Sequence, residues 1–374
     1  MKRFPLKATR FLYLNIGKPF LFLFDAEAVH GFATSLGAVL GAICPLKWLM
    51  KKAAAPRDAS FTQTVAGIRF AGPIGLAAGF DYEARLTQIL PAVGFGFETV
   101  GTITNGAYEG NKKPRLGRLP KSRSLLVNKG FKNRGIRAIL AKLSGKKFEI
   151  PIGISIGVTN SPELSSQELA IADISAAFDE AEKSSVSFSY YELNISCPNL
   201  RVKTDFYSPE NLSNLLAAVT GKKLRKPLFV KMPIDKTDGQ ALAMLETISR
   251  YPVQGIIFGN LQRSRDTLVP EEVALAVKGG LSGKPTEKRS NELIALAYRN
   301  YGNKLAIVGC GGVFNAEDAY RKIRLGASLI QMITGMIYEG PQLIGEINLN
   351  LAELLKRDGF SKISDAVGAD NRAE

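Results

Sequence analysis

The sequence predicts an α/β protein, a closed (β/α)8 TIM barrel with an N-terminal helical extension. From Gly75 onward, short apolar runs alternate with helical patterns, and a Gly- or Asn-rich loop follows most of the runs. The runs are continuously apolar, as expected of strands that are covered on both faces. Eight such units match a closed parallel barrel.

The expected strands share an apolar, β-rich composition and end at glycine or polar residues. They are Gly75–Phe80, Phe97–Ile103, Ile152–Gly157, Tyr190–Ser196, Leu228–Pro233, Gly255–Asn260, Leu305–Gly309 and Ser328–Thr334. Helical patterns are clearest at Ser208–Thr220, Gly239–Arg250, Ala316–Leu325 and Leu343–Leu355. A doubly wound open sheet is the main alternative, but the sequence gives no clear signal of reversed strand order.

Residues 1–55 have a different character and are predicted to be a separate helical region, with the barrel spanning 56–374. Apolar and aromatic runs are interrupted by charges at Lys18, Asp25 and Glu27 and by Pro19, so no uncharged run is long enough to span a bilayer. Two short amphipathic helices lying on a membrane would fit, with basic residues toward anionic lipid. Those residues are Lys2, Arg3, Lys7, Arg10 and Lys18. A helical cap packed on the barrel fits equally well.

Composition limits the kinds of partner and of catalytic or metal site that we expect in this chain. The net charge of +15 favours an anionic partner, but the basic residues are scattered and no run resembles a nucleic-acid arm. The three cysteines, Cys44, Cys197 and Cys310, are too widely spaced for a disulfide framework or a zinc site, which favours an intracellular location. His30 is the single histidine, so a catalytic triad or a histidine-based metal site is not expected.

Polar residues gather where the strands end, which is where such barrels place their active sites. Cys197 lies between Asn194 and Asn199, and two carboxamides beside a thiol suit a polar, planar ligand that loses a proton. The alternative is a strand that runs into a proline turn with a small buried cysteine. Lys231 interrupts an apolar strand, so it is expected either to point into a cavity with a partner or to reach the barrel rim.

Glycines follow the last two strands. Cys310-Gly311-Gly312-Val313 ends strand seven and Thr334-Gly335 ends strand eight. Glycines let backbone N–H groups approach an anion, and the loops after strands seven and eight form the usual phosphate site of these barrels. Each loop alone could equally be a tight turn.

Several motifs together resemble the dihydroorotate dehydrogenase family over about Phe11 to Leu355. They are Gly75-Leu76-Ala77-Ala78-Gly79-Phe80-Asp81, Gly94 to Thr104, Gly110-Asn111-Lys112-Lys113-Pro114-Arg115, Asn194 to Asn199, Gly279 to Gly283, and Ile307 to Gly340. The N-terminal region resembles the membrane-associated, quinone-dependent class, in which such an extension forms a quinone tunnel.

The resemblance implies oxidation of dihydroorotate to orotate by FMN, with a quinone as acceptor, in pyrimidine synthesis at the intracellular side of a membrane. It implies that Cys197 is the base that removes a proton from carbon 5 while hydride leaves carbon 6. The implied substrate residues are Asn128, Gly130, Phe131, Asn194, Asn199 and Asn260, and the implied FMN residues are Ala78, Gly79, Thr102, Asn194, Lys231, Gly283, Gly312, Ile333 and Thr334. No metal or nucleic acid is implied.

The chain departs from the family pattern mainly on the substrate side. The quinone-dependent class usually has serine where Cys197 stands, and Tyr82 replaces a lysine that touches flavin and the orotate carboxylate. Ser155 replaces an asparagine, and Gly259 and Leu261 replace two threonines. An FMN barrel oxidoreductase for another cyclic amide, or a flavin-binding protein without activity, therefore remains an alternative.

Overall fold

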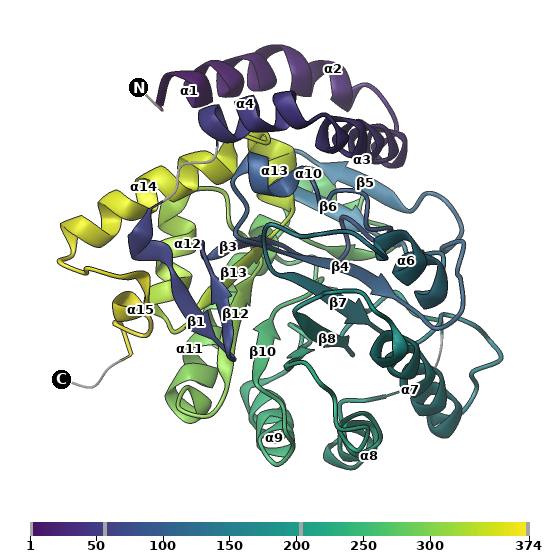
Figure 1. Cartoon of the computed structure of the whole chain (residues 1–374). Helices are drawn as coiled ribbons and strands as arrows, with labels where there is room; N and C mark the ends of the chain where they lie inside the picture. The colour runs from purple at the N-terminus through teal and green to yellow at the C-terminus, as the bar shows by residue number, and fades with distance from the viewer. Residues whose placement is uncertain (1–2, 55–57, 202–204, 372–374) are drawn as a thin grey trace.

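The computed structural model describes residues 3–54, 58–201 and 205–371. Its centre is a closed, all-parallel barrel with the strand order β10-β12-β13-β3-β4-β7-β8-β9 (Figure 1). The strands are β3 (Ile74–Leu76), β4 (Phe97–Ile103), β7 (Ile152–Ile156), β8 (Tyr190–Asn194), β9 (Leu228–Lys231), β10 (Gly255–Phe258), β12 (Ala306–Cys310) and β13 (Leu329–Met332). The predicted TIM barrel is confirmed, and all eight expected strands form it.

Helices cover the outside of the barrel, and each buries an apolar stripe against the strands. They are α5 (Leu90–Val93), α6 (Ile136–Leu143), α7 (Gln167–Lys183), α8 (Pro209–Thr220), α9 (Asp238–Ile248), α11 (Glu287–Tyr301), α12 (Ala316–Arg324), α13 (Thr334–Glu339), α14 (Leu343–Arg357) and α15 (Ile363–Ala366). Local chemistry explains several starts: Ser166, Ser208, Thr237 and Asn315 each accept a backbone N–H of the helix that follows.

Two small sheets close the two ends of the barrel. A hairpin forms from β1 (Gln63–Val65) and β2 (Ile68–Phe70), and its apolar residues pack with Phe97, Tyr190 and Phe229 at the amino ends of the strands. At the carboxyl ends, β5 (Leu116–Leu119), β6 (Ser124–Val127) and β11 (Gly280–Leu281) form an antiparallel sheet. The shorter helices are α10 (Pro270–Val273), η2 (Ala59–Phe61) and η3 (Lys284–Thr286).

The N-terminal helices form a cap over α13, α14 and the sheet β5–β6 (Figure 1). The cap consists of α1 (Arg3–Leu12), η1 (Tyr13–Gly17), α2 (Lys18–Phe22), α3 (Ala26–Ala42) and α4 (Cys44–Ala54). Pro19 does not end the first helix, because the π-turn η1 shifts the hydrogen bond of Lys18 N–H back to the oxygen of Tyr13 and relieves the proline ring.

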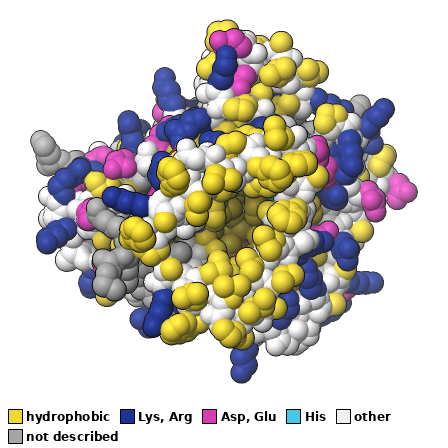
Figure 2. Space-filling view, turned by 90° about the horizontal axis from the view of Figure 1, so that it is seen from above, with side chains coloured by type: hydrophobic (Ala, Val, Ile, Leu, Met, Phe, Trp, Pro, Cys, Tyr) yellow, Lys and Arg dark blue, Asp and Glu magenta, His cyan; other side chains and the backbone are white. Residues whose placement is uncertain are grey.

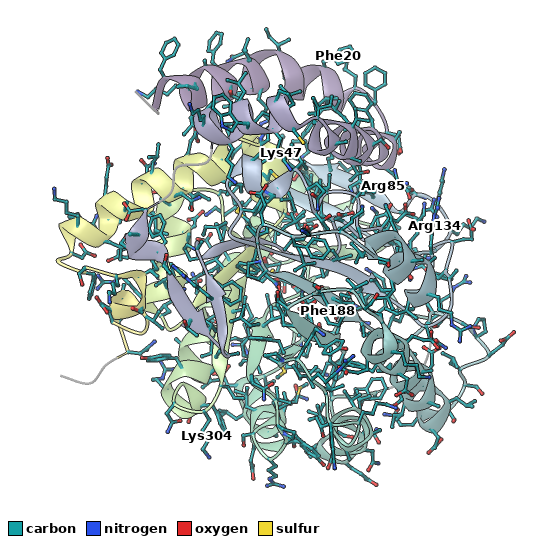
Figure 3. The ribbon with its side chains drawn as sticks, viewed as in Figure 1. Phe20, Lys47, Arg85, Arg134, Phe188 and Lys304 are labelled. Atoms are coloured by element: carbon teal, nitrogen blue, oxygen red, sulfur yellow. The ribbon has the colours of Figure 1, made fainter. Side chains whose placement is uncertain are left out.

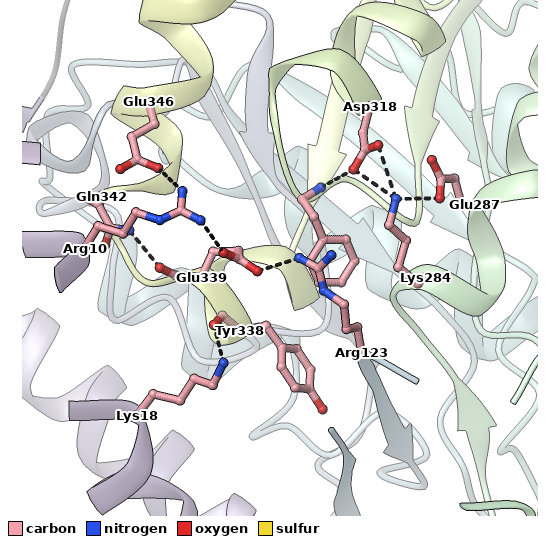
Figure 4. A network of polar contacts seen from close by, with 11 residues as sticks. Arg10, Lys18, Arg123, Lys284, Glu287, Asp318, Tyr338, Glu339, Gln342 and Glu346 are labelled. Carbon is pink, nitrogen blue, oxygen red and sulfur yellow. Dashed lines mark hydrogen bonds and ion pairs between the residues drawn. The ribbon is translucent and has the colours of Figure 1, made fainter. Parts of the chain in front are cut away.

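Polar contacts tie the cap to the barrel. Arg10 donates to Glu339 and Glu346 at 2.9 Å each, and Lys18 Nζ donates to the Tyr338 carbonyl at 3.1 Å (Figure 4). The expectation that Arg10 and Lys18 face lipid is therefore wrong. Carboxylates at the end of α13 and on α14 attract these cations inward. Lys7 is exposed, whereas Lys2 and the side chain of Arg3 lie outside the described part of the chain.

The outer face of the cap is apolar. Phe4, Phe20 and Leu23 are 78%, 59% and 80% exposed, and Phe20 points away from the molecule in Figure 3. Other exposed apolar side chains of the cap are those of Phe11, Leu12, Ile16, Phe24, Phe32, Leu36, Val39, Ile43, Trp48 and Leu49. From above, apolar side chains ring a hollow (Figure 2). Among the described residues, no single helix is long and apolar enough to cross a membrane; the pair Ala26–Ala42 and Cys44–Ala53 qualifies only jointly, with a 104° bend.

Candidate active site

Two adjoining cavities lie at the carboxyl ends of the barrel strands, where the barrel fold predicts the site. The first is lined by His30, Ala78, Gly79, Phe80, Tyr82, Thr102, Leu116, Leu125, Val127, Lys129, Gly130, Phe131, Lys132, Asn194, Cys197, Asn199, Asn260, Leu261, Ser282, Ile333, Thr334 and Ile337. The second contains Lys231, Gly283, Gly311, Gly312 and Gly335. Both cavities share Ala78, Asn260, Ile333 and Thr334, so they are neighbours around one rim.

A hydrogen-bonded group of asparagines holds the loop that carries Cys197. Asn194, the last residue of β8, donates to Thr102 Oγ1 at 2.8 Å and accepts from Ser196 N–H at 3.2 Å. Asn260, after β10, donates to Ser196 Oγ at 2.8 Å. Asn199 donates to the Val127 carbonyl at 2.8 Å. These bonds position the residues on both sides of Cys197.

Cys197 lines the same cavity as these amides, and its thiolate can accept a carbon-bound proton. Burial raises its pKa to about 11, although a backbone hydrogen bond at Asn199 and the charges of Arg263 and Lys231 act in the opposite direction. At neutral pH the thiol is therefore mostly protonated, and its rare thiolate is a strong base.

Lys231 ends β9 inside the barrel and is 3% exposed. Its ammonium lies 3.7 Å from Glu192 Oε1 on β8, and the same oxygen accepts a 2.8 Å hydrogen bond from Ser155 Oγ. Ser155 Oγ also bonds Thr102 Oγ1 at 2.9 Å. Glu192 thus links the buried lysine to the strand where the family asparagine is missing. Lys231 points into a cavity and has a partner, as expected.

The second cavity is walled by backbone. A Cβ at Gly312 would lie 2.3 Å from Glu287 Cβ, and one at Gly335 would lie 2.0 Å from the Val313 carbonyl oxygen. Gly312 also has φ +74°, a conformation that side chains rarely adopt. Only glycine fits these positions, and they lie in the loops after the last two barrel strands, where such barrels usually bind phosphate.

The loop after β6 supplies one wall of the first cavity. Gly130 and Phe131 line it, both with φ +63°. Asn128 is 3% exposed and is not among the lining residues; it accepts from Asn111 Nδ2 at 3.0 Å, while its own Nδ2 has no partner in the described part of the chain. Asn128 therefore ties the loop to Asn111, and its contact with substrate stays a prediction.

Sequence reasoning did not assign His30 or Lys129 to the first cavity. His30, on α3, bonds the Phe80 carbonyl at 2.8 Å and stacks on Tyr82 with ring centroids 5.4 Å apart. Lys129 Nζ lies 4.5 Å from the centroid of the same Tyr82 ring. Burial lowers the pKa of His30 to about 3, so this imidazole is neutral. No sequence motif marks His30, because only the folded cap brings it to the site.

The described residues contain no group of histidine, cysteine and carboxylate side chains that could hold a metal ion. Fold and site together define a TIM barrel whose rim has room for a phosphate-bearing ligand beside a polar, planar molecule.

Comparison with known proteins makes the class more specific. Residues 60–355 match the family model described as dihydroorotate dehydrogenase. The chain is 37% identical to dihydroorotate dehydrogenase (quinone) of Mycolicibacterium smegmatis, covering 93% of this chain and 97% of that protein. It is 36% identical to the protein of the same name from Deinococcus deserti, covering 96% and 100%.

Solved structures agree with the sequence comparison. The DHODH from Eimeria tenella in complex with ferulenol superposes with a TM-score of 0.80 and 26% identity, covering 93% of this chain and 96% of that chain. The ligand-free form superposes with a TM-score of 0.78 and 27% identity. The chain belongs to the dihydroorotate dehydrogenase family.

Proposed function

We infer that the protein oxidises dihydroorotate to orotate and passes the electrons to a quinone, in pyrimidine synthesis. The family and the quinone-linked names of the relatives support this reaction. The observation that carries it is that Cys197 shares one cavity with Asn194, Asn199 and Asn260, next to the glycine-walled cavity. In this arrangement the base and the amide groups would contact a pyrimidine ring that lies next to a bound cofactor.

The family implies a flavin, and we propose FMN in particular. The residues fit a flavin with a single phosphate: Gly312, Gly283 and Thr334 would hold the phosphate end. Ala78, Gly79, Thr102, Asn194, Lys231 and Ile333 would hold the ring. The cation of Lys231 would stabilise negative charge on a reduced ring. When bound, the flavin takes a hydride from carbon 6 of dihydroorotate and later reduces the quinone.

The protein's own groups orient the substrate and move one proton. The amides of Asn194, Asn199 and Asn260 can donate to ring carbonyls and accept from ring N–H groups. The Cys197 thiolate removes the proton from carbon 5. Because desolvation raises the pKa of the Cys197 thiol, its thiolate is a stronger base than it would be in water.

The test is reduction of the bound flavin by dihydroorotate without oxygen. We expect the visible flavin absorbance to bleach, and to return when a short-chain ubiquinone is added. A protein that binds flavin but does not bleach with dihydroorotate would overturn the proposed reaction. Bleaching by a different cyclic amide in that case would support the alternative substrate.

We further propose that the cap binds peripherally to a membrane and that the quinone enters through it. The first cavity extends from Cys197 to His30 on α3, and its wall toward the cap is apolar, with Leu116, Leu125 and Ile337. An exposed apolar face on the cap surrounds a hollow (Figure 2). Such a surface suits the boundary between headgroups and acyl chains.

Flotation with lipid vesicles tests the membrane proposal. We expect the intact chain to float with anionic phospholipid vesicles, and to float less with high salt because part of the attraction is electrostatic. If the intact chain stays at the bottom of the gradient at every salt concentration, the peripheral membrane location is wrong.

A further inference from the structure

Lys129 is a buried cation that faces the first cavity. It lies in the loop after β6, is 8% exposed and lines the cavity with Cys197 and Asn199. The loop is tied to the base-bearing loop, because Asn199 Nδ2 donates to the carbonyl of Val127, two residues before Lys129. The loop that carries Lys129 is therefore fixed to the loop that carries the base, and both residues line the same cavity.

The other lysines of the two cavities already have anionic partners. Lys132 Nζ donates to Glu27 at 3.3 Å, and Lys231 lies 3.7 Å from Glu192. Within residues 3–54, 58–201 and 205–371, no carboxylate lies within ion-pair distance of Lys129, and its ammonium donates no hydrogen bond. Its close contact is the face of Tyr82, at 4.5 Å from the ring centroid.

A buried ammonium without a counter-ion is costly, and an aromatic face compensates only part of the lost hydration. Accordingly, burial lowers the pKa of Lys129 to about 8. Neighbouring His30 cannot balance the charge, because it is neutral and has no anionic form in this range. The charge of Glu27 acts on the pKa of Lys129 in the opposite direction, but Glu27 already pairs with Arg115 and Lys132. The cavity wall thus holds a surplus of positive charge beside amides that suit a neutral ring.

We propose that Lys129 binds the carboxylate of dihydroorotate and orotate, in place of the lysine that Tyr82 replaces. The inference rests on the proposed function, since dihydroorotate supplies the anion. A carboxylate at this position would give Lys129 the partner that it lacks. Tyr82, which occupies the usual lysine position, then acts as the surface against which the ammonium is placed.

The experiment measures orotate affinity in the flavin-loaded protein, from the shift that a ligand causes in the flavin spectrum. Loss of a charge-assisted hydrogen bond in Lys129→Gln should weaken orotate binding roughly 10- to 100-fold. Uracil, the same ring without the carboxylate, should bind the variant and the wild type within about twofold of each other, and the KM for quinone should not change. Lys112→Gln, which removes an exposed lysine, is the matched control for net charge.

A second variant tests the exchange of positions. In Lys129→Gln/Tyr82→Lys, a cation returns to position 82, and orotate affinity should recover toward the wild-type value. Equal losses for orotate and uracil, unchanged orotate binding in Lys129→Gln, or a raised KM for quinone alone would each overturn the proposal. The proposed function fails separately, if dihydroorotate does not bleach the wild-type flavin.

A structure of the wild-type protein with orotate decides the matter even if Lys129→Gln does not fold. We expect Lys129 Nζ within hydrogen-bond distance of the carboxylate. A carboxylate bound by another cation, with Lys129 directed elsewhere, would overturn the assignment.

Discussion

The barrel rim and the cap both border the first cavity, but the side chains that they carry differ in polarity. At the rim, Asn194 and Asn260 are held by side-chain hydrogen bonds to Thr102 and Ser196. The cap presents exposed aromatic and aliphatic side chains and is attached by a few ion pairs, such as Arg10 with Glu339. The rim therefore carries polar groups that are held in place by hydrogen bonds, whereas the cap carries an exposed apolar surface.

The structure also shows where the positions that depart from the family pattern lie. The phosphate side of the rim keeps glycines that no other residue can replace, because their Cβ atoms would collide with backbone or neighbouring side chains. Of the positions that depart from the family pattern, Tyr82 lines the first cavity, Gly259 lines the second and Leu261 lines both.

The largest expected effect is loss of the base. Cys197→Ala should slow flavin reduction by dihydroorotate about 10²-fold or more, because no other described group on the cavity is placed as a base. Stopped-flow absorbance under anaerobic conditions measures it. Flavin content and melting temperature should stay close to wild type, and an unchanged rate in a folded variant would remove the role of the thiol.

A smaller effect is expected on the cap. Leu23→Ser removes an 80% exposed leucine and should weaken vesicle binding roughly tenfold or more, since burying a leucine stabilises by about 1.5–3 kcal/mol. Co-sedimentation with vesicles measures the partition. Leu169→Ser, on α7 away from the cap, is the matched control; an equal loss there would show that the cap has no special part in binding.

The pH dependence of flavin reduction tests the role of the Cys197 thiolate as the base. Because burial raises the pKa of Cys197 to about 11, the thiolate fraction should grow about tenfold per pH unit between pH 7 and 9. The rate of flavin reduction should rise accordingly. Saturating dihydroorotate is required, so that titration of Lys129 affects binding and not the measured step. A flat profile would show that the thiolate does not take the proton in the limiting step.

The smallest effect concerns attachment of the cap. Glu339 accepts from both Arg10 and Arg123, and Glu339→Gln should weaken this attachment by about 1 kcal/mol because the arginines are partly exposed (Figure 4). Hydrogen exchange of α1 amides should speed up about fivefold. Glu246→Gln, which breaks an exposed pair with Arg250, should leave α1 exchange unchanged. Equal exchange in wild type and Glu339→Gln would show that apolar packing alone holds the cap.

The sequence by itself determined the barrel and most of the rim. Continuous apolar runs identify buried strands, and parallel strands must place their carboxyl ends together, so Asn194, Cys197 and Asn260 could be assigned to one site before any coordinates. Glycine pairs mark backbone that needs positive φ, which is a local property of the chain. Six of the eight expected strands were predicted to end one to four residues beyond the observed ends. The strand from Phe97 ends at Ile103 as predicted, and the strand from Leu305 was predicted to end one residue before the observed Cys310.

Tertiary structure alone decided the contacts between distant segments. His30 and Tyr82 are separated by about fifty residues and stack only when the cap docks, and Arg10 turns inward because α13 and α14 offer carboxylates. The position of Lys129 over Tyr82 depends on the same docking of loops. These contacts depend on packing and charge interactions between segments that are far apart in the sequence, and no local pattern of residues specifies them.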